Sequence, residues 1–325
     1  MPPGRPTAFL NYITIITIIQ EHILICPMNL FTAGRFFPHR LTNQPKWDII
    51  NNDCRIAAVS ICAMENQEAL MIEKIKRYRF LFEELVKRDF TKKYKRTALG
   101  MLWSVLGPLM TLAVMALVFT QFFGRNTPHF IIYMFCGNLL FTYFKESTAT
   151  GMTSLYDNSS IFSKVNVPKY MFLLSKNVSA LINFGINLCI LFIFMLIDQV
   201  TFTWKLVLLI YPIGCLVGFN LGMGLILSAL YMMFRDFKYL YDIFTMLLMY
   251  LSAIFYRVDA FPEETRWLFN LNPVYVNISY FRSIILEQTI PPLWHHAIAA
   301  GYAIVALAIG ALIYKRKNYK FLYYI

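Results

Sequence analysis

Charged residues are scarce in this sequence. Asp, Glu, Lys and Arg together make up 15% of the 325 residues, whereas hydrophobic residues make up 58%. So few charges cannot cover a soluble globule of this size with a hydrated surface. The composition excludes an ordinary soluble domain and predicts an all-α protein that crosses a membrane several times.

Sequence motifs for nucleotide and metal binding are also missing. The phosphate-binding pattern G-x-x-x-x-G-K-[S/T] does not occur, so we do not expect this chain to bind ATP in that way. The cysteines show no C-x-x-C spacing, which argues against a metal site or a disulfide framework. They are Cys26, Cys54, Cys62, Cys136, Cys189 and Cys215. We expect no catalytic residue, no metal and no cofactor on this chain.

Long apolar segments are what the sequence has instead. Trp103 to Phe123 runs without one charge, and five more apolar segments follow. They are Pro128 to Leu155, Asn177 to Ile197, Leu206 to Phe234, Tyr239 to Tyr256 and Ala297 to Tyr314. At a rise of about 1.5 Å per residue, each can cross a hydrocarbon core of about 30 Å, the last two with little to spare. The sequence therefore predicts six transmembrane helices in a domain of residues 99–325.

Basic residues concentrate on one side of these predicted spans. If the segment before the first span is cytoplasmic, the inside loops carry nineteen Lys and Arg residues. The outside loops carry five, which are Arg125, Lys205, Arg257, Arg266 and Arg282. The positive-inside rule then places both termini in the cytoplasm. Because topology explains the net charge of +12, a nucleic-acid partner is not expected.

The first 63 residues fit no span. The apolar stretch Ala8 to Ile19 is too short to cross a membrane before polar residues interrupt it. We treat residues 1–63 as an extension of unknown role. One hypothesis is that translation starts at Met64 or Met71, which N-terminal sequencing would test.

Residues 64–98 form an amphipathic unit before the first span. Apolar residues recur there at steps of three and four, as in a helix with one apolar face. They are Ile75, Tyr78, Phe82, Val86, Phe90 and Tyr94. With its many cations, this segment is predicted to be a helix lying in the cytoplasmic headgroup layer. Asp89 falls within the apolar arc, and we expect it either to pair with Lys93 one turn later or to contact another element that times a conformational change.

Three stretches of the sequence resemble one transporter family. They are LVKRDFTKKYKRTALGMLWSVLGPL at 85–109, FRDFKYLYDIF at 234–244 and YRVDAFPEETRWLFNLNPVY at 256–275. In this order and at these spacings they are similar to the permease subunit of ABC-2 type polysaccharide exporters, which export O-antigen, teichoic acid and rhamnan-type polymers. The resemblance runs from about Met71 to the C-terminus.

The resemblance implies an assembly. Two copies of the permease would form a homodimer, docked on two copies of a separate nucleotide-binding subunit that holds ATP and Mg²⁺. The implied cargo is a lipid-linked polysaccharide, moved across the cytoplasmic (inner) membrane for the cell envelope. The implied fold is the ABC-2 exporter fold.

The resemblance also implies a coupling helix in the cytoplasmic loop at 158–176. Its candidate contacts to the ATPase are Ile161, Phe162, Val165, Pro168 and Lys169. Apolar side chains in a short loop are costly to leave in water unless a surface covers them. That surface belongs either to the ATPase or to this chain's own helix ends.

Two further sets of cytoplasmic residues are candidates for the same machinery. Arg235 and Asp236 end the fourth span, where they form a structural ion pair or contact the ATPase or the amphipathic helix. In the amphipathic helix itself, the candidate gate residues are Arg88, Asp89, Tyr94 and Arg96.

A polar stripe marks the third span. Ser179, Asn183 and Asn187 recur every four residues on one face, which cannot face lipid because the amides would go unpaired. Either they hydrogen-bond to a neighbouring helix or they line a wet channel for sugar.

Two charges interrupt the second span. Lys145 and Glu146 need partners or water, since a central charge costs about 2.5 to 3.5 kcal/mol on insertion scales. We expect them in the cytoplasmic half, near the point where a polymer would enter. Trp103 and Tyr143 complete the candidate channel lining, as aromatic rings that either stack on sugars or pack in the core or at the membrane interface.

Small residues and prolines predict two more features. Gly214, Gly218 and Gly222 lie on one face of the fourth span and predict close helix packing, which we expect to be intramolecular.

The outer segment between Tyr256 and Ala297 is too hydrophobic for an ordinary external loop. We expect re-entrant helices that close the outer mouth.

Other functions fit the sequence less well. A drug or lipid efflux permease of the same superfamily would share the topology and remains the alternative. A membrane acyl- or glycosyltransferase would need a base or nucleophile with an orienting partner, yet no histidine lies in a spanning core. A proton-coupled carrier would need ionisable groups through the membrane, and only Lys145 and Glu146 clearly qualify.

Overall fold

The structure is a computed structural model, and it describes residues 78–93, 99–123, 128–164 and 167–317. The chain divides into two compact units, Met1–Met71 and Ile72–Ile325, and all described residues belong to the second. The predicted N-terminal extension lies outside them. So do three of the candidate site residues, Tyr94, Arg96 and Val165.

Every regular element in the described part of the chain is a helix. After the helix at residues 78–93, the elements are η1 (Gly100–Leu102), α3 (Trp103–Phe123), α4 (Phe130–Asp157), α5 (Ser159–Phe162), α6 (Tyr170–Ile197), η3 (Trp204–Leu209), α7 (Ile210–Met233), α8 (Phe237–Leu251), η4 (Val258–Ala260), α9 (Glu263–Arg266), η5 (Trp267–Leu271), α10 (Pro273–Ile285) and α11 (Leu293–Lys317). The predicted all-α class is confirmed.

Four helical stretches are long and apolar enough to cross a membrane. They are Trp103–Thr120, Tyr170–Ile197, Trp204–Met233 and Leu293–Arg316. The other two predicted spans differ from these for physical reasons. α4 has 28 residues but includes three charged residues and several hydroxyl groups, which lower its mean hydropathy. α8 has 15 residues and ends at Leu251, five residues before the predicted boundary.

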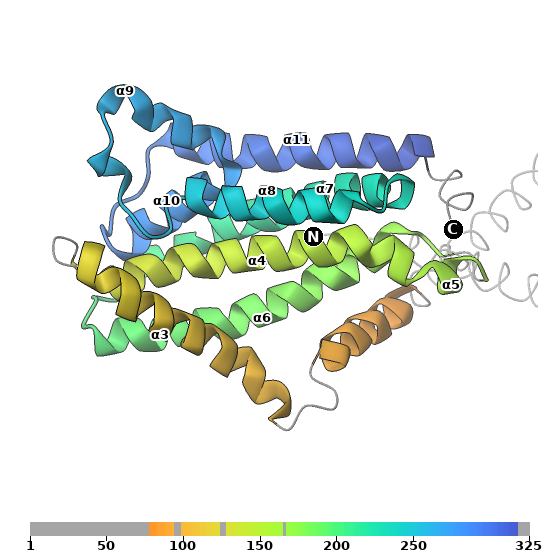
Figure 1. Ribbon diagram of the computed structural model, residues 1–325, viewed down its shortest axis with the longest axis horizontal. Coiled ribbons are helices and arrows are strands. Elements are labelled where there is room, and N and C mark those ends of the chain that lie inside the picture. The colour runs from red at the N-terminus through yellow and green to blue at the C-terminus, as the bar shows by residue number, and fades with distance from the viewer. Residues whose placement is uncertain (1–77, 94–98, 124–127, 165–166, 318–325) are drawn as a thin grey trace, which may run out of the picture. The chain divides into compact units, whose positions relative to one another are not determined.

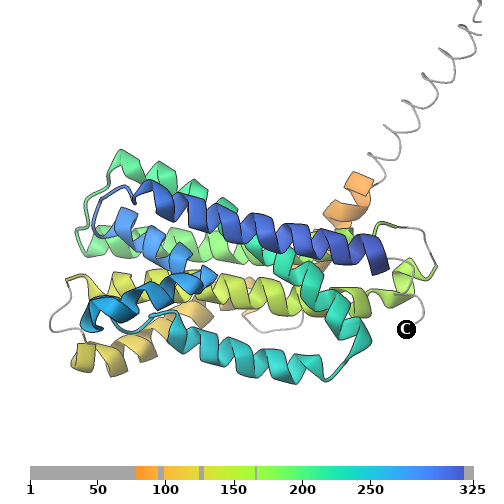
Figure 2. The same ribbon diagram turned by 90° about the horizontal axis from the view of Figure 1, so that it is seen from above.

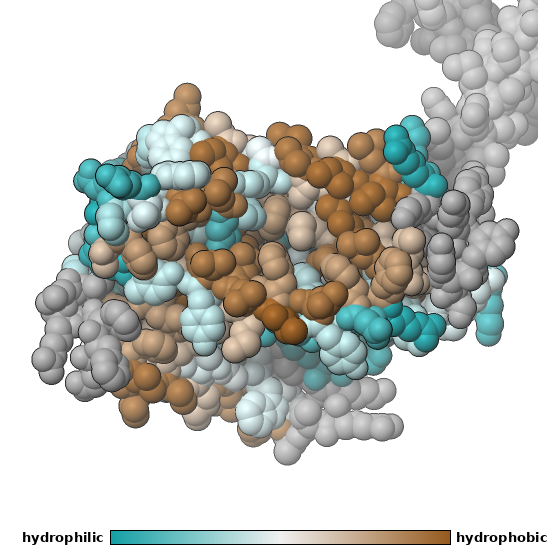
Figure 3. Space-filling model, turned by 45° about the horizontal axis from the view of Figure 1, so that its top comes forward, coloured by the Kyte–Doolittle hydropathy of each residue, from teal (hydrophilic) through white to brown (hydrophobic). Residues whose placement is uncertain are grey.

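α4 lies at the centre of the described unit. It packs against α6 on one side and α7 on another, and α7 packs in turn along α11. Figures 1 and 2 show these long helices running side by side, with α3 inclined to them. Aromatic side chains fill the middle, including Phe135 and Phe144 on α4 and Tyr280 and Phe281 on α10. In Figure 3 hydrophilic residues gather at both ends of the face shown, and hydrophobic residues occupy most of the surface between them.

The glycine face of α7 meets α11 of the same chain. A methyl group added at Gly222 would overlap the backbone of Ala306, and one at Gly218 would lie 3.4 Å from Cβ of Ala303. A methyl group added at Gly310 of α11 would lie 2.8 Å from the backbone oxygen of Gly222. Gly214 has open space around it. Two of the three predicted glycines therefore lie where helices approach closely, and their partner is intramolecular as expected.

The outer segment folds back into the core. α10 begins at Asn272, whose side chain accepts hydrogen bonds from the backbone N–H groups of Val274 and Tyr275, and Pro273 occupies the first turn. Most of the following residues are buried against α4 and α7. The expectation that Arg282 belongs to an outside loop is wrong, because Arg282 lies on α10 and is 6% exposed. The 13-residue helix α10, which carries Arg282, packs into the core in place of the expected loop.

Candidate functional site

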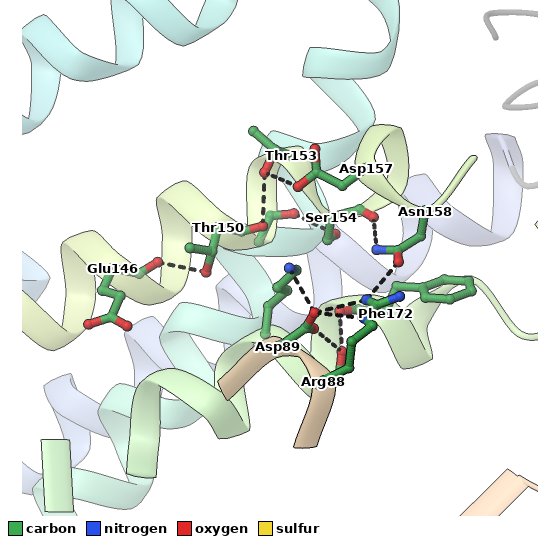
Figure 4. A network of polar contacts seen from close by, with 12 residues as sticks. Arg88, Asp89, Glu146, Thr150, Thr153, Ser154, Asp157, Asn158 and Phe172 are labelled. Carbon is green, nitrogen blue, oxygen red and sulfur yellow. Dashed lines mark hydrogen bonds and ion pairs between the residues drawn. The ribbon is translucent and has the colours of Figure 1, made fainter. Parts of the chain in front are cut away.

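Asp89 anchors the helix at 78–93 to the other helices of the described unit. Its side chain is 3% exposed, and Oδ1 lies 2.8 Å from Nη2 of Arg88 and 3.2 Å from Nζ of Lys176. The hydroxyl of Ser175 donates to Oδ2 at 3.2 Å. Figure 4 shows these groups converging between the helix and the start of α6. Asp89 thus contacts another element, α6, and the ion pair of Lys93 is with Glu146. A role of this contact in timing a conformational change stays a prediction.

Arg88 extends this anchor to the cytoplasmic loop. Its Nη2 donates to Oδ1 of Asn158 at 2.8 Å, and Asn158 donates to the backbone oxygen of Ser154 at 2.7 Å. Asn158 directly precedes α5, the short helix in the predicted coupling loop. Arg88 and Asp89 therefore join three segments that are far apart in sequence (Figure 4).

The coupling loop covers its own apolar residues. Phe162 is 6% exposed and its ring lies 6.2 Å from that of Phe172. Both belong to a cluster with Leu85 of the helix at 78–93, and Ile161 packs against this cluster. For Phe162 the structure shows the alternative explanation, packing against this chain's own helix ends.

The polar part of the loop is more accessible. Ser163 and Lys164 are exposed, and Pro168 is half-buried. The ammonium of Lys169 lies 5.6 Å from the ring centroid of Phe162, and partial burial lowers the pKa of Lys169. In this loop Ser163 and Lys164 are therefore accessible to a partner, whereas Phe162 is not.

Arg235 and Asp236 are both exposed, and no ion pair joins them. The expected structural pair is therefore wrong. The guanidinium of Arg235 instead lies 4.9 Å from the ring centroid of Tyr156 at the end of α4, which makes an edge contact with Tyr231 of α7. A cation over an aromatic face is attracted by the ring quadrupole. The α7–α8 connection and the end of α4 thus form one surface.

A cavity of about 560 Å³ lies between α3, α4 and α6. It brings together five of the seven predicted channel residues, which are Trp103, Tyr143, Glu146, Asn183 and Asn187. The other two do not line it, since Lys145 is exposed on α4 and Ser179 is buried elsewhere on α6. The remaining lining consists of Lys93, Ser104, Gly107, Pro108, Thr111, Phe135, Asn138, Leu139, Thr142, Ala180 and Phe184.

Glu146 organises the polar wall of this cavity. Its Oε1 accepts hydrogen bonds of 2.8 Å from Nζ of Lys93 and from Nδ2 of Asn183. Asn187 donates to the backbone oxygen of Asn183 at 2.8 Å. The charge that interrupts α4 therefore has a cationic partner from the helix at 78–93 and an amide partner from α6. This pairing offsets the cost of placing a carboxylate at membrane depth.

A second set of bonds joins α4 to α6 beside the cavity. The hydroxyl of Tyr143 donates to Oδ1 of Asn177 at 2.9 Å, and Asn177 donates to Oγ of Ser147 at 2.8 Å. The polar residues of α6 thus hydrogen-bond between helices and also face a cavity. The sequence analysis named Lys93 only as a candidate partner of Asp89, because its partner Glu146 lies 53 residues away. It missed Asn177, which lies off the four-residue stripe.

A second, apolar groove of about 610 Å³ lies beside α8. It is lined on one side by Phe244, Leu248 and Leu251, and on the other by the segment from Phe261 to Pro273. In the described part of the chain, no group of three or more His, Cys, Asp and Glu residues has an arrangement that would hold a metal ion.

Comparison with known proteins agrees with this architecture. The ABC-2 type transporter family model matches residues 81–286. The chain is 26% identical over 255 residues to the O-antigen export system permease protein RfbA of Myxococcus xanthus, covering 77% of this chain and 97% of that relative. It is 25% identical over 249 residues to the protein of the same name in Klebsiella pneumoniae, covering 74% and 95%. The resemblance of the three sequence stretches is confirmed, and this chain belongs to the ABC-2 type transporter family as a membrane permease, a transport subunit without a catalytic domain.

Proposed function

We propose that this permease exports a lipid-linked polysaccharide of the O-antigen, teichoic acid or rhamnan type across the cytoplasmic membrane. The observation that carries the proposal is the match to O-antigen export permeases, which extends over 97% of the length of one of them. The cavity between α3, α4 and α6 supports it, because its mixed wall includes a carboxylate, amides and hydroxyls. A polymer rich in hydroxyl groups needs polar surroundings in the membrane, because each unpaired hydroxyl in hydrocarbon costs kilocalories.

The working unit is a homodimer with two copies of a separate nucleotide-binding subunit, which holds ATP and Mg²⁺. Apolar side chains exposed on the described unit support the dimer. They lie on α3 and α8 and include Met110, Val114, Leu117, Leu240, Ile243 and Leu247. Exposed patches of this kind fit either lipid or a second copy of the chain. Docking to the ATPase involves the exposed part of the coupling loop and the surface formed by Arg235 and Tyr156.

Six spans with both termini in the cytoplasm complete the proposal. α4 and α8 join the four apolar stretches as spans. Glu146 of α4 has partners within the bundle, and the short α8 is followed by the folded-back outer segment. Exposed cations of the helix at 78–93, such as Lys87 and Lys92, each attract an anionic lipid headgroup by roughly 1 kcal/mol.

Depletion of the permease tests the proposal. We expect a cell surface without the glycan and lipid-linked glycan accumulating at the inner face of the cytoplasmic membrane. Restoring the wild-type chain is the control and should reverse both effects. An intact surface glycan together with altered sensitivity to apolar drugs would reject polysaccharide export.

The apolar groove beside α8 supports the second candidate, efflux of a lipid or an apolar drug. Its lining would suit a hydrocarbon chain better than a sugar. The same depletion experiment separates the two functions, since efflux predicts changed drug or lipid content and an unchanged surface glycan.

A further inference from the structure

The cavity between α3, α4 and α6 has the size of a ligand site. Its volume of about 560 Å³ lies within the range in which proteins hold small molecules, about 300 to 1,000 Å³. Four helices contribute to its wall, with Lys93 from the helix at 78–93, Trp103 from α3, Glu146 from α4 and Asn187 from α6. Side chains that are distant in sequence therefore converge on one space.

The charges of the lining balance each other. Lys93 and Glu146 are the two charged residues among the lining side chains, and they form an ion pair of 2.8 Å. A phosphate group in the cavity would face the Glu146 carboxylate, and an ammonium group would face the Lys93 ammonium. The lining therefore favours a neutral ligand over an ionic one.

The uncharged polar groups of the lining disfavour a hydrocarbon chain. They are the amides of Asn138, Asn183 and Asn187 and the hydroxyls of Ser104, Thr111 and Thr142. An acyl chain would displace water from these groups and offer no hydrogen bond in return. A neutral ligand that carries many hydroxyl groups fits this wall.

Two acceptor atoms are left for such hydroxyls. Both hydrogen bonds that Glu146 accepts end at Oε1, so Oε2 is left for a ligand. Asn187 is 8% exposed, and its Oδ1 accepts no hydrogen bond within the described residues. A buried acceptor without a donor is destabilising, and a ligand hydroxyl would relieve this. The indole of Trp103 is 49% exposed and offers an aromatic face at the edge of the same cavity.

We propose that this cavity binds a neutral sugar unit. The sugar hydroxyls donate to Glu146 and Asn187, its apolar face stacks on Trp103, and the phosphate-linked end of the cargo stays outside. The inference rests on the proposed function, which supplies a glycan as cargo. It goes further by naming the part of the cargo that this cavity recognises and the residues that recognise it.

The test measures binding to the full chain purified in detergent. Tryptophan fluorescence is followed during titration with maltotriose, mannotriose or triacetylchitotriose as neutral probes, and with inorganic pyrophosphate as an anionic probe. We expect a saturable change with at least one trisaccharide, little affected by salt. Trp103→Phe should abolish the change, and Glu146→Gln and Asn187→Ala should each weaken binding about tenfold or more.

Lys145→Gln is the matched control, because Lys145 is the exposed neighbour of Glu146 and lies outside the lining. Its affinity should equal that of the wild type. The elution volume in size-exclusion chromatography and the helical circular dichroism signal verify that each variant is folded. If Glu146→Gln does not fold, the affinity of Asn187→Ala tests the proposal.

Several outcomes would overturn the proposal. One is no saturable response to any trisaccharide, and another is unchanged affinity in Asn187→Ala. A third is saturable pyrophosphate binding that salt weakens and Lys93→Gln abolishes, which would make the cavity an anion site. Because export is measured separately in cells, normal glycan export without sugar binding would reject this site and leave the proposed function standing.

Discussion

The guanidinium of Arg282 on α10 lies 3.5 Å from the ring centroid of Tyr133 on α4. The same guanidinium donates to the backbone oxygens of Tyr133, Ala253 and Ile254 at 3.1, 2.9 and 3.1 Å. The last two carbonyls follow the end of α8, where Ala253 has a φ of 48°. A helix end leaves carbonyls without intrahelical partners. Arg282 supplies donors to this region and joins α4, α8 and α10 on the outer side.

Replacing Arg282 by Met should destabilise the permease strongly. The variant leaves three carbonyls unpaired, and each buried unpaired group costs about 1 to 3 kcal/mol. We expect a loss of several degrees in the thermal unfolding midpoint of the detergent-purified protein. Arg266→Met is the control, because Arg266 donates to two backbone oxygens in an exposed setting. Equal midpoints for the two variants would contradict this role of Arg282.

Gly222→Ala should destabilise the contact between α7 and α11. The added methyl group would overlap the backbone of Ala306, and a helix backbone cannot move aside without separating the two helices. We expect a cost of about 1 to 3 kcal/mol, seen as a lower unfolding midpoint. Gly214→Ala introduces the same methyl group into open space on the same helix. It should be neutral or slightly stabilising, because Ala favours the helix by about 1 kcal/mol over Gly.

Asp89→Asn should loosen the helix at 78–93. The variant leaves the cations of Arg88 and Lys176 without their shared carboxylate. Hydrogen exchange of the backbone amides in residues 78–93 should become about tenfold faster or more, since a hydrogen bond to a charged group contributes about 1.5 to 3 kcal/mol. Glu83→Gln serves for comparison because it removes an exposed pair with Arg79 on the same helix. Unchanged exchange in Asp89→Asn would show that apolar packing alone holds the helix.

Phe162→Asp should lower the amount of folded permease. The sequence left two possible covers for Phe162, the ATPase or this chain's own helix ends, and the structure buries Phe162 against Phe172 of the same chain. A buried carboxylate without a partner costs several kcal/mol. Immunoblots of membranes should therefore show less protein and a lower unfolding midpoint. A wild-type level combined with lost export would restore the docking role of this residue.

Lys164→Glu and Arg235→Glu should leave the amount of folded permease unchanged and lower its export. Both side chains are exposed, so their reversal should leave folding unchanged. If these surfaces dock the ATPase, co-purification of the ATPase should decrease at least several-fold and export should decrease with it. Lys315→Glu, near the end of α11, is the control. Full recovery of the ATPase with both variants would place docking elsewhere.

The sequence by itself determined the class of this protein and the location of its helices. Charge scarcity and apolar length define a membrane protein, because they reflect the hydrocarbon solvent rather than any partner within the fold. α3 has the bounds of the first apolar segment named from the sequence, Trp103 to Phe123. The three sequence stretches also identified the family. Helix location and family motifs are local properties, because they depend on residues that are neighbours along the chain.

Only the tertiary structure decided which polar residues meet. Lys93 pairs with Glu146 across 53 residues, and Arg88 bonds Asn158 across 70. Periodicity places a residue on a helix face but does not say which helix that face meets. For this reason the expected neighbour pair of Arg235 with Asp236 was wrong, while Arg282, expected in an outside loop, lies in the core. A buried charge needs a partner, because leaving it unpaired is costly. Which partner it finds depends on how the helices pack in three dimensions and not on spacing in the sequence.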